Sequence, residues 1–131
     1  MRGRCQLNKP VRQGEKRKRL YMSANHLVNI RECCCLICGG HPVDAHHLLR
    51  TGEHGMGRRS SDRWATPLCR GLDGHHKGPD SPHAHGDEDA WFASYGLDGR
   101  AIAKALWAAR WDLEAMQRIA FNAAQKVRTG V

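Results

Sequence analysis

The sequence predicts an α+β fold: a small core of loops and short strands stapled by metal, with α-helices flanking it. Three observations lead to this prediction. The segment 33–86 is rich in glycine, proline and histidine, and it contains eight of the nine histidines. Its cysteines have the spacing of a zinc site. The segment 87–131 instead has apolar residues at intervals of three and four, which predicts amphipathic helices.

A chain of 131 residues is long enough for one domain and too short for two independent cores. We therefore expect a single domain over residues 20–131, preceded by an arm over residues 1–19. Residues 1–20 contain eight Lys or Arg against Glu15, whereas the rest of the chain contains thirteen basic and twelve acidic residues. This composition predicts a disordered, flexible basic arm attracted to polyanions, first DNA or RNA. The alternative is a solubilising tail.

The sequence carries neither a membrane span nor a secretion signal. No apolar run approaches the ~18 residues that a span requires, and the basic start lacks a following apolar segment. We therefore expect a cytoplasmic protein that does not act at a membrane. In a reducing compartment, the six cysteines are better explained as metal ligands than as disulfides.

The regular elements are predicted in the order helix, strand, strand, helix, helix. The stretch RLYMSANHLVNIRE predicts a short helix over about residues 18–31, from the spacing of its apolar side chains. AHHLLR (45–50) and RWATPLC (63–69) are the two candidate strands. A polar, glycine-containing loop separates them.

The C-terminal part is predicted to be helical. DEDAWFASYG predicts a helix from Asp87 that stops at Gly96, because acids suit a helix N-terminus and glycine often follows its C-terminus. A second amphipathic stretch starts at Asp98. It either runs to about Lys126 or breaks so that Asp112 begins a further helix, and the pattern leaves both open. Helical spacing assigns the aromatic residues of this region to the core rather than to base stacking: Trp91, Phe92, Trp107 and Trp111.

A structural zinc site is predicted from two halves. Cys35 and Cys38 form a C-x2-C knuckle followed by two glycines, and Cys69 follows about thirty residues later with a histidine pair behind it. Three cysteines and one histidine would close a tetrahedron. We favour His75 over His76 as the fourth ligand.

The register of this site stays open at the sequence level. Cys33 and Cys34 precede the knuckle directly, and Cys34-x3-Cys38 is also a possible ligand pair. The alternative without metal treats Cys35 and Cys38 as small buried apolar residues. The downstream cysteine and histidines favour zinc, whose binding contributes on the order of 10 to 16 kcal/mol in small domains.

The chain resembles the HNH nucleases of the ββα-metal class. The resemblance covers about residues 35–107 and rests on CLICGGHPVDAHHL, GRRSSDRWATPLCRG, the later HH and H, and GDEDAWFASYGLDGRAIAKALW, in this order. It is similar in particular to the small phage and prophage HNH proteins related to the recombination-enhancement nuclease Ref. The implied fold is a zinc-stapled ββα-metal core with flanking helices.

The resemblance implies roles for the adjacent histidines of DAHHLL. His46 would bind the catalytic divalent ion, and His47 would be the general base that removes a proton from the attacking water. Neighbouring side chains of an extended segment point in opposite directions, so different roles also suit the geometry. Asp62 falls where the class has its middle Asn, which orients the base.

The remaining ligands of the catalytic ion are also implied by the resemblance. His76 matches the histidine that opens the final helix, and His83 is our choice for the third ligand, with His85 as the alternative. Two insertions, LDG before the histidine pair and GPDSP after it, depart from the usual pattern of the class. The histidines that we expect to be exposed and inert are His26, His41 and His54.

In this interpretation the protein is a metal-dependent DNA endonuclease that acts in phage or prophage recombination or DNA processing. The partners implied by the resemblance are then DNA and a recombinase filament, in the cytoplasm of a bacterial host at its nucleoid. Mg²⁺ or Mn²⁺ would be the catalytic ion. The alternative is a non-catalytic, zinc-containing nucleic-acid-binding or recombination accessory module. Basic residues near the motif are candidate phosphate contacts: Arg58, Arg59, Arg70 and Lys77.

Overall fold

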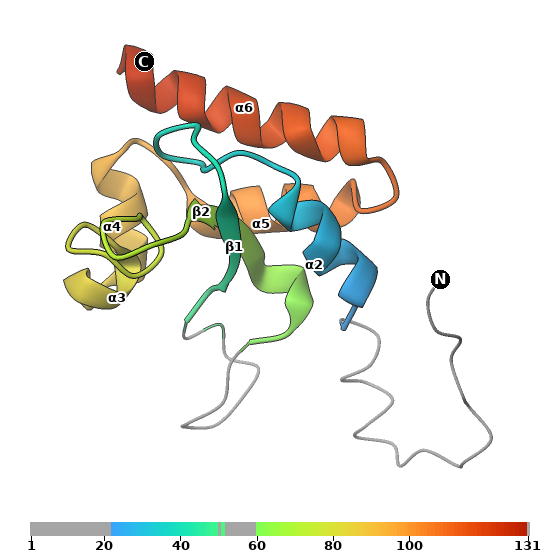
Figure 1. Ribbon diagram of the computed structural model, residues 1–131, viewed down its shortest axis with the longest axis horizontal. Helices are drawn as coiled ribbons and strands as arrows, with labels where there is room; N and C mark the ends of the chain where they lie inside the picture. The colour runs from blue at the N-terminus through green and yellow to red at the C-terminus, as the bar shows by residue number, and fades with distance from the viewer. Residues whose placement is uncertain (1–21, 50, 52–59, 131) are drawn as a thin grey trace.

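The computed structural model describes residues 22–49, 51 and 60–130. The predicted arm over residues 1–19 lies outside the described residues, and so do His54, Arg58 and Arg59. The element order is α2, β1, η1, β2, α3, α4, α5, α6 (Figure 1), which makes a small α+β fold as predicted.

The two strands form an antiparallel hairpin in the middle of the molecule (Figure 1). β1 (Val43–His47) pairs with β2 (Ala65–Cys69), with Val43 opposite Cys69 and His47 opposite Ala65. The first strand therefore begins and ends earlier than the predicted 45–50. Beyond the strand, Leu48 N still donates to Trp64 O at 3.0 Å, whereas Leu49 N donates to the Glu88 carboxylate.

The second strand starts at Ala65, later than the predicted 63–69. The first two residues of the predicted strand, Arg63 and Trp64, belong to the 3-10 turn η1 (Asp62–Trp64), in which Trp64 N donates to Ser61 O at 3.0 Å. This turn places the Asp62 side chain beside the end of β1.

The first described helix, α2 (Ala24–Arg31), is shorter than the predicted 18–31. Ser23 is extended and caps the helix, since its Oγ accepts from His26 N at 3.1 Å. A serine at this position satisfies a backbone N–H that no helical carbonyl can reach, so the helix begins there.

Three aspartates begin the three C-terminal helices. They are Asp87 before α4 (Glu88–Ser94), Asp98 before α5 (Gly99–Ala108) and Asp112 before α6 (Leu113–Thr129). The chain therefore breaks at Asp112, which decides between the two patterns that the sequence left open. The predicted stop at Gly96 is also confirmed, with a positive φ of 76°.

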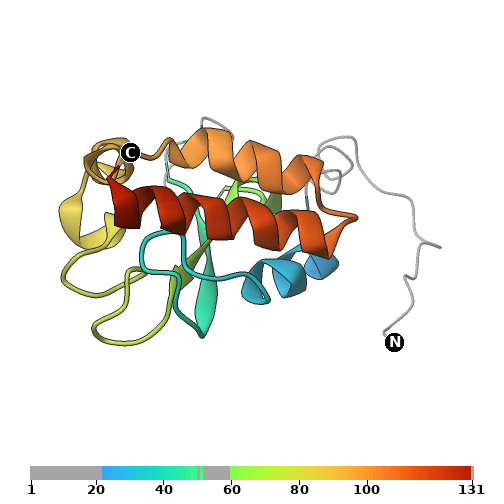
Figure 2. The same ribbon diagram turned by 90° about the horizontal axis from the view of Figure 1, so that it is seen from above.

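A further short helix, α3 (Pro82–His85), was not predicted. α5 and α6 lie side by side in both views of the molecule, while α3 and α4 lie at the opposite end from α2 (Figures 1 and 2). Of the helices that the structure describes, none is long and apolar enough to cross a membrane.

The core lies between the hairpin and the helices. Trp91 and Phe92 are almost completely buried, as predicted. The prediction for Trp111 is wrong, because its side chain is 80% exposed in the turn between α5 and α6. The prediction for His26 is also wrong: it is 1% exposed, with its ring edge against Trp107. Helical spacing could not show that the helix ends before Trp111, or that Trp107 of α5 packs against His26 of α2.

Candidate metal centres and a histidine–aspartate pair

A cysteine cluster joins the knuckle before β1 to the end of β2. One ligand atom from each of Cys35, Cys38, Cys69 and His75 lies within 4.8 Å of the others. The Sγ atoms of Cys38 and Cys69 are 3.8 Å apart, and His75 Nδ1 lies 3.2 Å from Cys69 Sγ. A tetrahedral zinc ion with Zn–S bonds of ~2.3 Å has its sulfurs about 3.8 Å apart. The cysteine cluster can therefore hold a metal ion, and its dimensions are compatible with zinc.

Burial and backbone amides set the electrostatics of the cysteine cluster. Burial raises the pKa of the Cys35 thiol to about 12, and it also raises the pKa of Cys69. The N–H groups of Ile37 and His75 donate to Cys35 Sγ and Cys69 Sγ at 3.4 and 3.1 Å. These amides favour the thiolates without offsetting their burial, so the donor set fits a cation that supplies the missing positive charge.

The other nitrogen of His75 faces a carboxylate. His75 Nε2 lies 3.9 Å from Asp80 Oδ2, and Trp91 Nε1 donates to Asp80 Oδ1 at 2.7 Å. Tyr95 also donates its hydroxyl proton to Asp80. A carboxylate behind an imidazole fixes the orientation of a ligand. Asp80 therefore connects the cysteine cluster to the aromatic side chains of the α4 region.

Cys33 and Cys34 do not join the cysteine cluster. The Cys33 thiol is buried and lies 3.4 Å from the Asn29 carbonyl in α2, to which it donates. Among the registers that the spacing left open, the structure thus brings Cys35 and Cys38 to the cluster. The cysteines within the described ranges are all free of disulfides.

A histidine cluster lies next to the cysteine cluster. His46 of β1, His76 after β2 and His83 of α3 each place a ring nitrogen within 4.8 Å of the other two. Their ring centroids are 5.1 to 5.3 Å apart. The alternative third ligand, His85, is exposed and accepts a hydrogen bond from Asp87 N instead. The geometry thus separates the two candidates in favour of His83.

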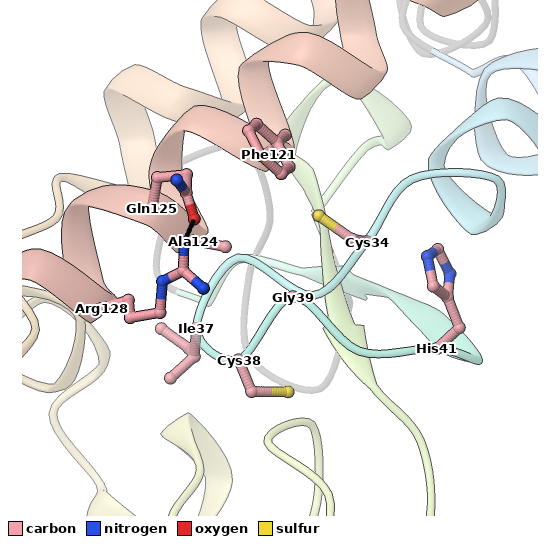
Figure 3. A pocket seen from close by; sticks show the side chains of 9 residues that line it. All are labelled: Cys34, Ile37, Cys38, Gly39, His41, Phe121, Ala124, Gln125 and Arg128. Atoms are coloured by element: carbon pink, nitrogen blue, oxygen red, sulfur yellow. Dashed lines mark hydrogen bonds between the residues drawn. The ribbon is translucent and has the colours of Figure 1, made fainter.

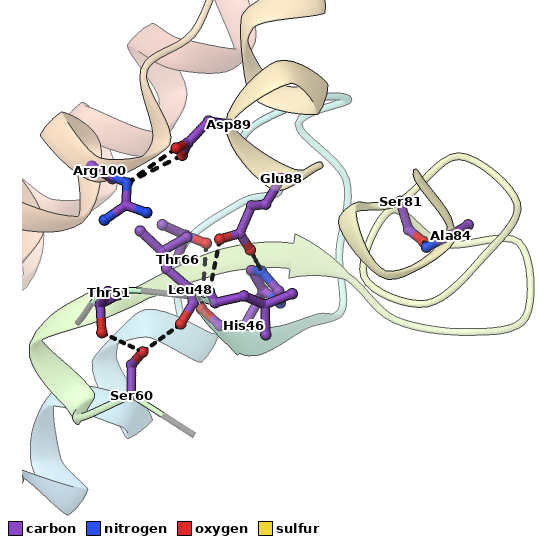
Figure 4. Close-up of polar contacts among 11 residues, drawn as sticks. His46, Leu48, Thr51, Ser60, Thr66, Ser81, Ala84, Glu88, Asp89 and Arg100 are labelled. Atoms are coloured by element: carbon purple, nitrogen blue, oxygen red, sulfur yellow. Dashed lines mark hydrogen bonds and ion pairs between the residues drawn. The ribbon is translucent and has the colours of Figure 1, made fainter. Parts of the chain in front are cut away.

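Two carboxylates hold this histidine cluster from behind. Glu88, at the start of α4, places Oε1 2.5 Å from His46 Nε2 and accepts from Leu49 N at 2.7 Å (Figure 4). Asp44 Oδ2 lies 3.0 Å from His76 Nδ1. Each carboxylate fixes the proton on the nitrogen that it faces, so the other nitrogen offers a lone pair.

The histidine cluster also fits a cation by its electrostatics. Burial lowers the pKa of both His76 and His83, which favours the neutral form that binds metal. The pKa of Asp44 is lowered as well, because hydrogen bonds with His76 and Arg70 outweigh its burial. His46 Nδ1 is buried without a hydrogen-bond partner. An unpartnered imidazole nitrogen beside two other histidines suits a divalent ion.

His47 points to a different partner from its neighbour His46. His47 Nε2 lies 2.8 Å from Asp62 Oδ1, and the other carboxylate oxygen of Asp62 accepts from Ser23 N at 2.8 Å. Asp62 is 3% exposed, so its negative charge is buried against these donors. β1 therefore separates the two rings as expected for adjacent residues of a strand, and the cap of α2 holds the aspartate in place.

Comparison with known proteins identifies a family for this chain. The sequence profile described as "Protein of unknown function (DUF968)" matches residues 11–110, which is more than half of the chain. The chain belongs to the DUF968 family. The matched region includes the hairpin, both clusters and α5, and it ends before α6. No curated protein and no solved structure gives a significant match.

The DUF968 chain places two of the four predicted phosphate contacts in described segments. Arg70 donates to Asp44 Oδ1 at 2.9 Å and to Val43 O at 3.2 Å, so it already steadies the carboxylate behind His76. Lys77 is exposed directly after His76.

Several positioning residues of the DUF968 chain were missed by the sequence argument. Asp44 had a usable signal, because strand alternation places it on the same face as His46. Glu88 lies in the first turn of a predicted helix, where an acid is explained by the helix dipole alone. Asp80 and Ser23 act across 5 and 39 residues of sequence, and no local pattern links them to their partners.

A cleft of about 480 Å³ in the DUF968 chain lies between the knuckle and α6 (Figure 3). Its lining includes Cys38 of the cysteine cluster together with Phe121 and Arg128 of α6. No member of the histidine cluster lines it, and neither does His47. The cleft therefore belongs to the outer side of the knuckle and is not part of the histidine site.

Proposed function

We propose that this DUF968 protein is a metal-dependent DNA endonuclease of the HNH type, which hydrolyses phosphodiester bonds. One observation carries the proposal. A three-histidine cluster able to hold a divalent ion adjoins, through consecutive residues of β1, a histidine whose ring is oriented by a buried aspartate. An ion site and an oriented base are the two components that phosphodiester hydrolysis requires.

His47 is the general base in this proposal. Nε2–H of His47 donates a hydrogen bond to Asp62, so Nδ1 has the lone pair that takes a proton from the attacking water. Asp62 acts as a positioning residue, because its second oxygen is held by Ser23 N and its carboxylate cannot turn away from the ring.

The chain's own residues prepare the ion site. His46, His76 and His83 would hold a divalent ion, which when bound stabilises charge on the phosphate and on the departing oxygen. Glu88 and Asp44 keep the two inner rings in their ligating orientation. His83 is exposed, so the site is open on the side from which DNA would approach. Mg²⁺ and Mn²⁺ are the proposed ions.

The cysteine cluster is the scaffold in this proposal, and zinc is its ion. It joins the knuckle, β2 and the loop that carries His76, so it fixes the place of one histidine ligand. The hairpin, the histidine loop and α3 would then form the ββα-metal core that the resemblance implies. The basic arm and Lys77 would attract DNA, and action on phage or prophage DNA with a recombinase partner follows from the resemblance alone.

Plasmid cleavage tests the proposed function. Supercoiled plasmid is incubated with the purified protein and Mg²⁺ or Mn²⁺, and nicking is followed on a gel. Loss of His47 should lower the rate about 10²- to 10⁴-fold. His41→Ala is the matched control, because His41 is an exposed histidine that lines the outer cleft.

Two results would contradict the proposed enzymatic activity. Equal nicking by the wild type and by His47→Ala would show that another base or a contaminant cuts. Salt-sensitive DNA binding without cleavage under any divalent ion would instead favour the non-catalytic nucleic-acid-binding module.

A further inference from the structure

Indole rings and cationic side chains alternate along the surface formed by η1 and α5. Arg63 and Lys104 lie over the Trp64 ring, 5.4 and 5.8 Å from its centroid. Beyond them, the Arg110 guanidinium lies 4.3 Å from the Trp107 centroid and 5.1 Å from that of Trp111. We call these six residues the cation–indole surface: Arg63, Trp64, Lys104, Trp107, Arg110 and Trp111.

Trp111 is the unusual member of this surface. Trp64 is 8% exposed, whereas Trp111 is 80% exposed and stands in the turn before α6. Arg110 covers one face of the Trp111 ring, and it is itself fixed by donating to Trp107 O at 2.9 Å. The indole is thus braced on one side and open to solvent on the other. Rigid aromatic rings with an open face are the platforms on which nucleic-acid bases stack.

The cation–indole surface begins beside the proposed base. Arg63 directly follows Asp62, whose carboxylate orients His47. At the α5 end, the Trp107 ring stands edge-on to buried His26 with centroids 5.0 Å apart. Arg110, Asp62 and His47 all lie close enough to His26 for their charges to act on it. His26 therefore lies between the Trp107 end of this surface and the His47–Asp62 pair.

The chemistry of the surface matches a polyanion that also exposes aromatic faces. Arg63, Lys104 and Arg110 supply three positive charges among the indoles. The two acids adjacent to these residues in sequence both have partners: Asp62 pairs with His47 and accepts from Ser23 N, and Asp112 Oδ1 accepts from Ala115 N at 3.1 Å at the start of α6. A duplex hides its base faces within the stack, whereas an unpaired nucleotide presents them together with its phosphate.

We propose that Trp111 and Arg110 form a stacking platform for an unpaired base, and that the protein prefers DNA with a single-stranded segment over intact duplex. The preference as a substrate rests on the proposed nuclease function. The binding preference itself does not, because it can be measured without cleavage.

The experiment uses the full-length, metal-loaded protein carrying His47→Ala, so that no DNA is cut during titration. Fluorescence anisotropy gives the affinity for a labelled oligothymidylate of about 16 nucleotides and for a duplex of the same length. Trp111→Ala should weaken binding to the oligothymidylate about 5- to 150-fold, with a much smaller effect on the duplex. Trp111→Phe should retain part of the affinity.

The matched control is Phe121→Ala, which removes another exposed aromatic side chain, on the cleft side of α6. It should leave both affinities unchanged. An unchanged oligothymidylate affinity in Trp111→Ala, or equal losses for single strand and duplex, would overturn the platform.

The outcomes also separate this proposal from the proposed function. If the wild type never cuts DNA but Trp111→Ala loses single-strand affinity, the platform stands and the nuclease fails. If the wild type cuts plasmid and Trp111→Ala binds oligothymidylate normally, the nuclease stands and the platform fails.

Discussion

The cysteine cluster and the histidine cluster are neighbours that differ in what surrounds their donor atoms. His75 and His76 are consecutive, yet His75 turns to the sulfurs and His76 to the imidazoles. Backbone N–H groups donate to the sulfurs, whereas carboxylates stand behind the imidazoles. Amides favour negatively charged thiolates, whereas the carboxylates orient the imidazoles, and burial favours the neutral form of His76 and His83.

Under the proposed function, this difference predicts a division of labour between the clusters. Three thiolates and one imidazole complete the tetrahedron of a structural zinc site. Three neutral imidazoles leave both charge and coordination positions available, which is the property of a catalytic site. One ion should therefore be needed for folding and the other for activity alone.

Removal of a sulfur ligand should have the largest effect. Cys69→Ala leaves the zinc site with three donors, and zinc binding in small domains is worth on the order of 10 kcal/mol. We expect loss of bound zinc and of cooperative thermal unfolding, measured by metal analysis and circular dichroism. Cys34→Ala is the control, since Cys34 adjoins the cluster without belonging to it. If Cys69→Ala retained zinc and native stability, the scaffold role would be wrong.

The next largest effect should be a loss of stability in acid, caused by His26, which belongs to neither cluster. Burial lowers the pKa of His26 to about 4, with Arg110 and His47 adding to this and Asp62 opposing it. Above pH 6.5 the ring is neutral in both folded and unfolded chains. As the pH falls from 6.5 to 4, His26 becomes protonated in the unfolded chain but stays neutral in the folded chain. The free energy of unfolding therefore falls by up to about 3 kcal/mol.

Urea denaturation at pH 7.5 and pH 5 measures this loss. His26→Phe keeps a ring against Trp107 and removes the titrating group, so its stability should depend less on pH than that of the wild type. Identical pH dependence in the two proteins would mean that His26 is not the group responsible.

The two clusters also show how far sequence can predict a site. The cysteines were predicted from spacing, because zinc imposes a short knuckle and a distant second half whatever the fold. The histidine cluster was expected from a resemblance, and its members do lie together. Glu88 and Asp80 could not be predicted, since a carboxylate acts there through tertiary packing. The exposure of Trp111 could not be predicted either, because α5 ends at Ala108 and Asp112 begins a new helix, so Trp111 lies in the turn between them.

Two histidines of one helical turn give a sharper test of the histidine cluster. His83→Ala should weaken binding of the exchangeable ion at least 100-fold, because a ligand is lost, and plasmid nicking should fall with it. His85→Ala, on the same short helix but outside the cluster, should change neither. Mn²⁺ affinity followed by electron paramagnetic resonance measures the first effect. If His85→Ala lost Mn²⁺ affinity and His83→Ala did not, His85 would be the third ligand instead of His83.

The smallest effect should come from the carboxylate behind His46. Glu88→Gln keeps the size of the side chain but removes the charge that fixes the His46 ring, so Mn²⁺ affinity should fall 10- to 100-fold while zinc content stays constant. Asp89→Asn is the matched control: Asp89 is the next residue of α4, and it pairs on the surface with Arg100 (Figure 4). Loss of zinc in Glu88→Gln would show that the two clusters depend on each other, since Glu88 and Trp91 extend from the same short helix to opposite clusters.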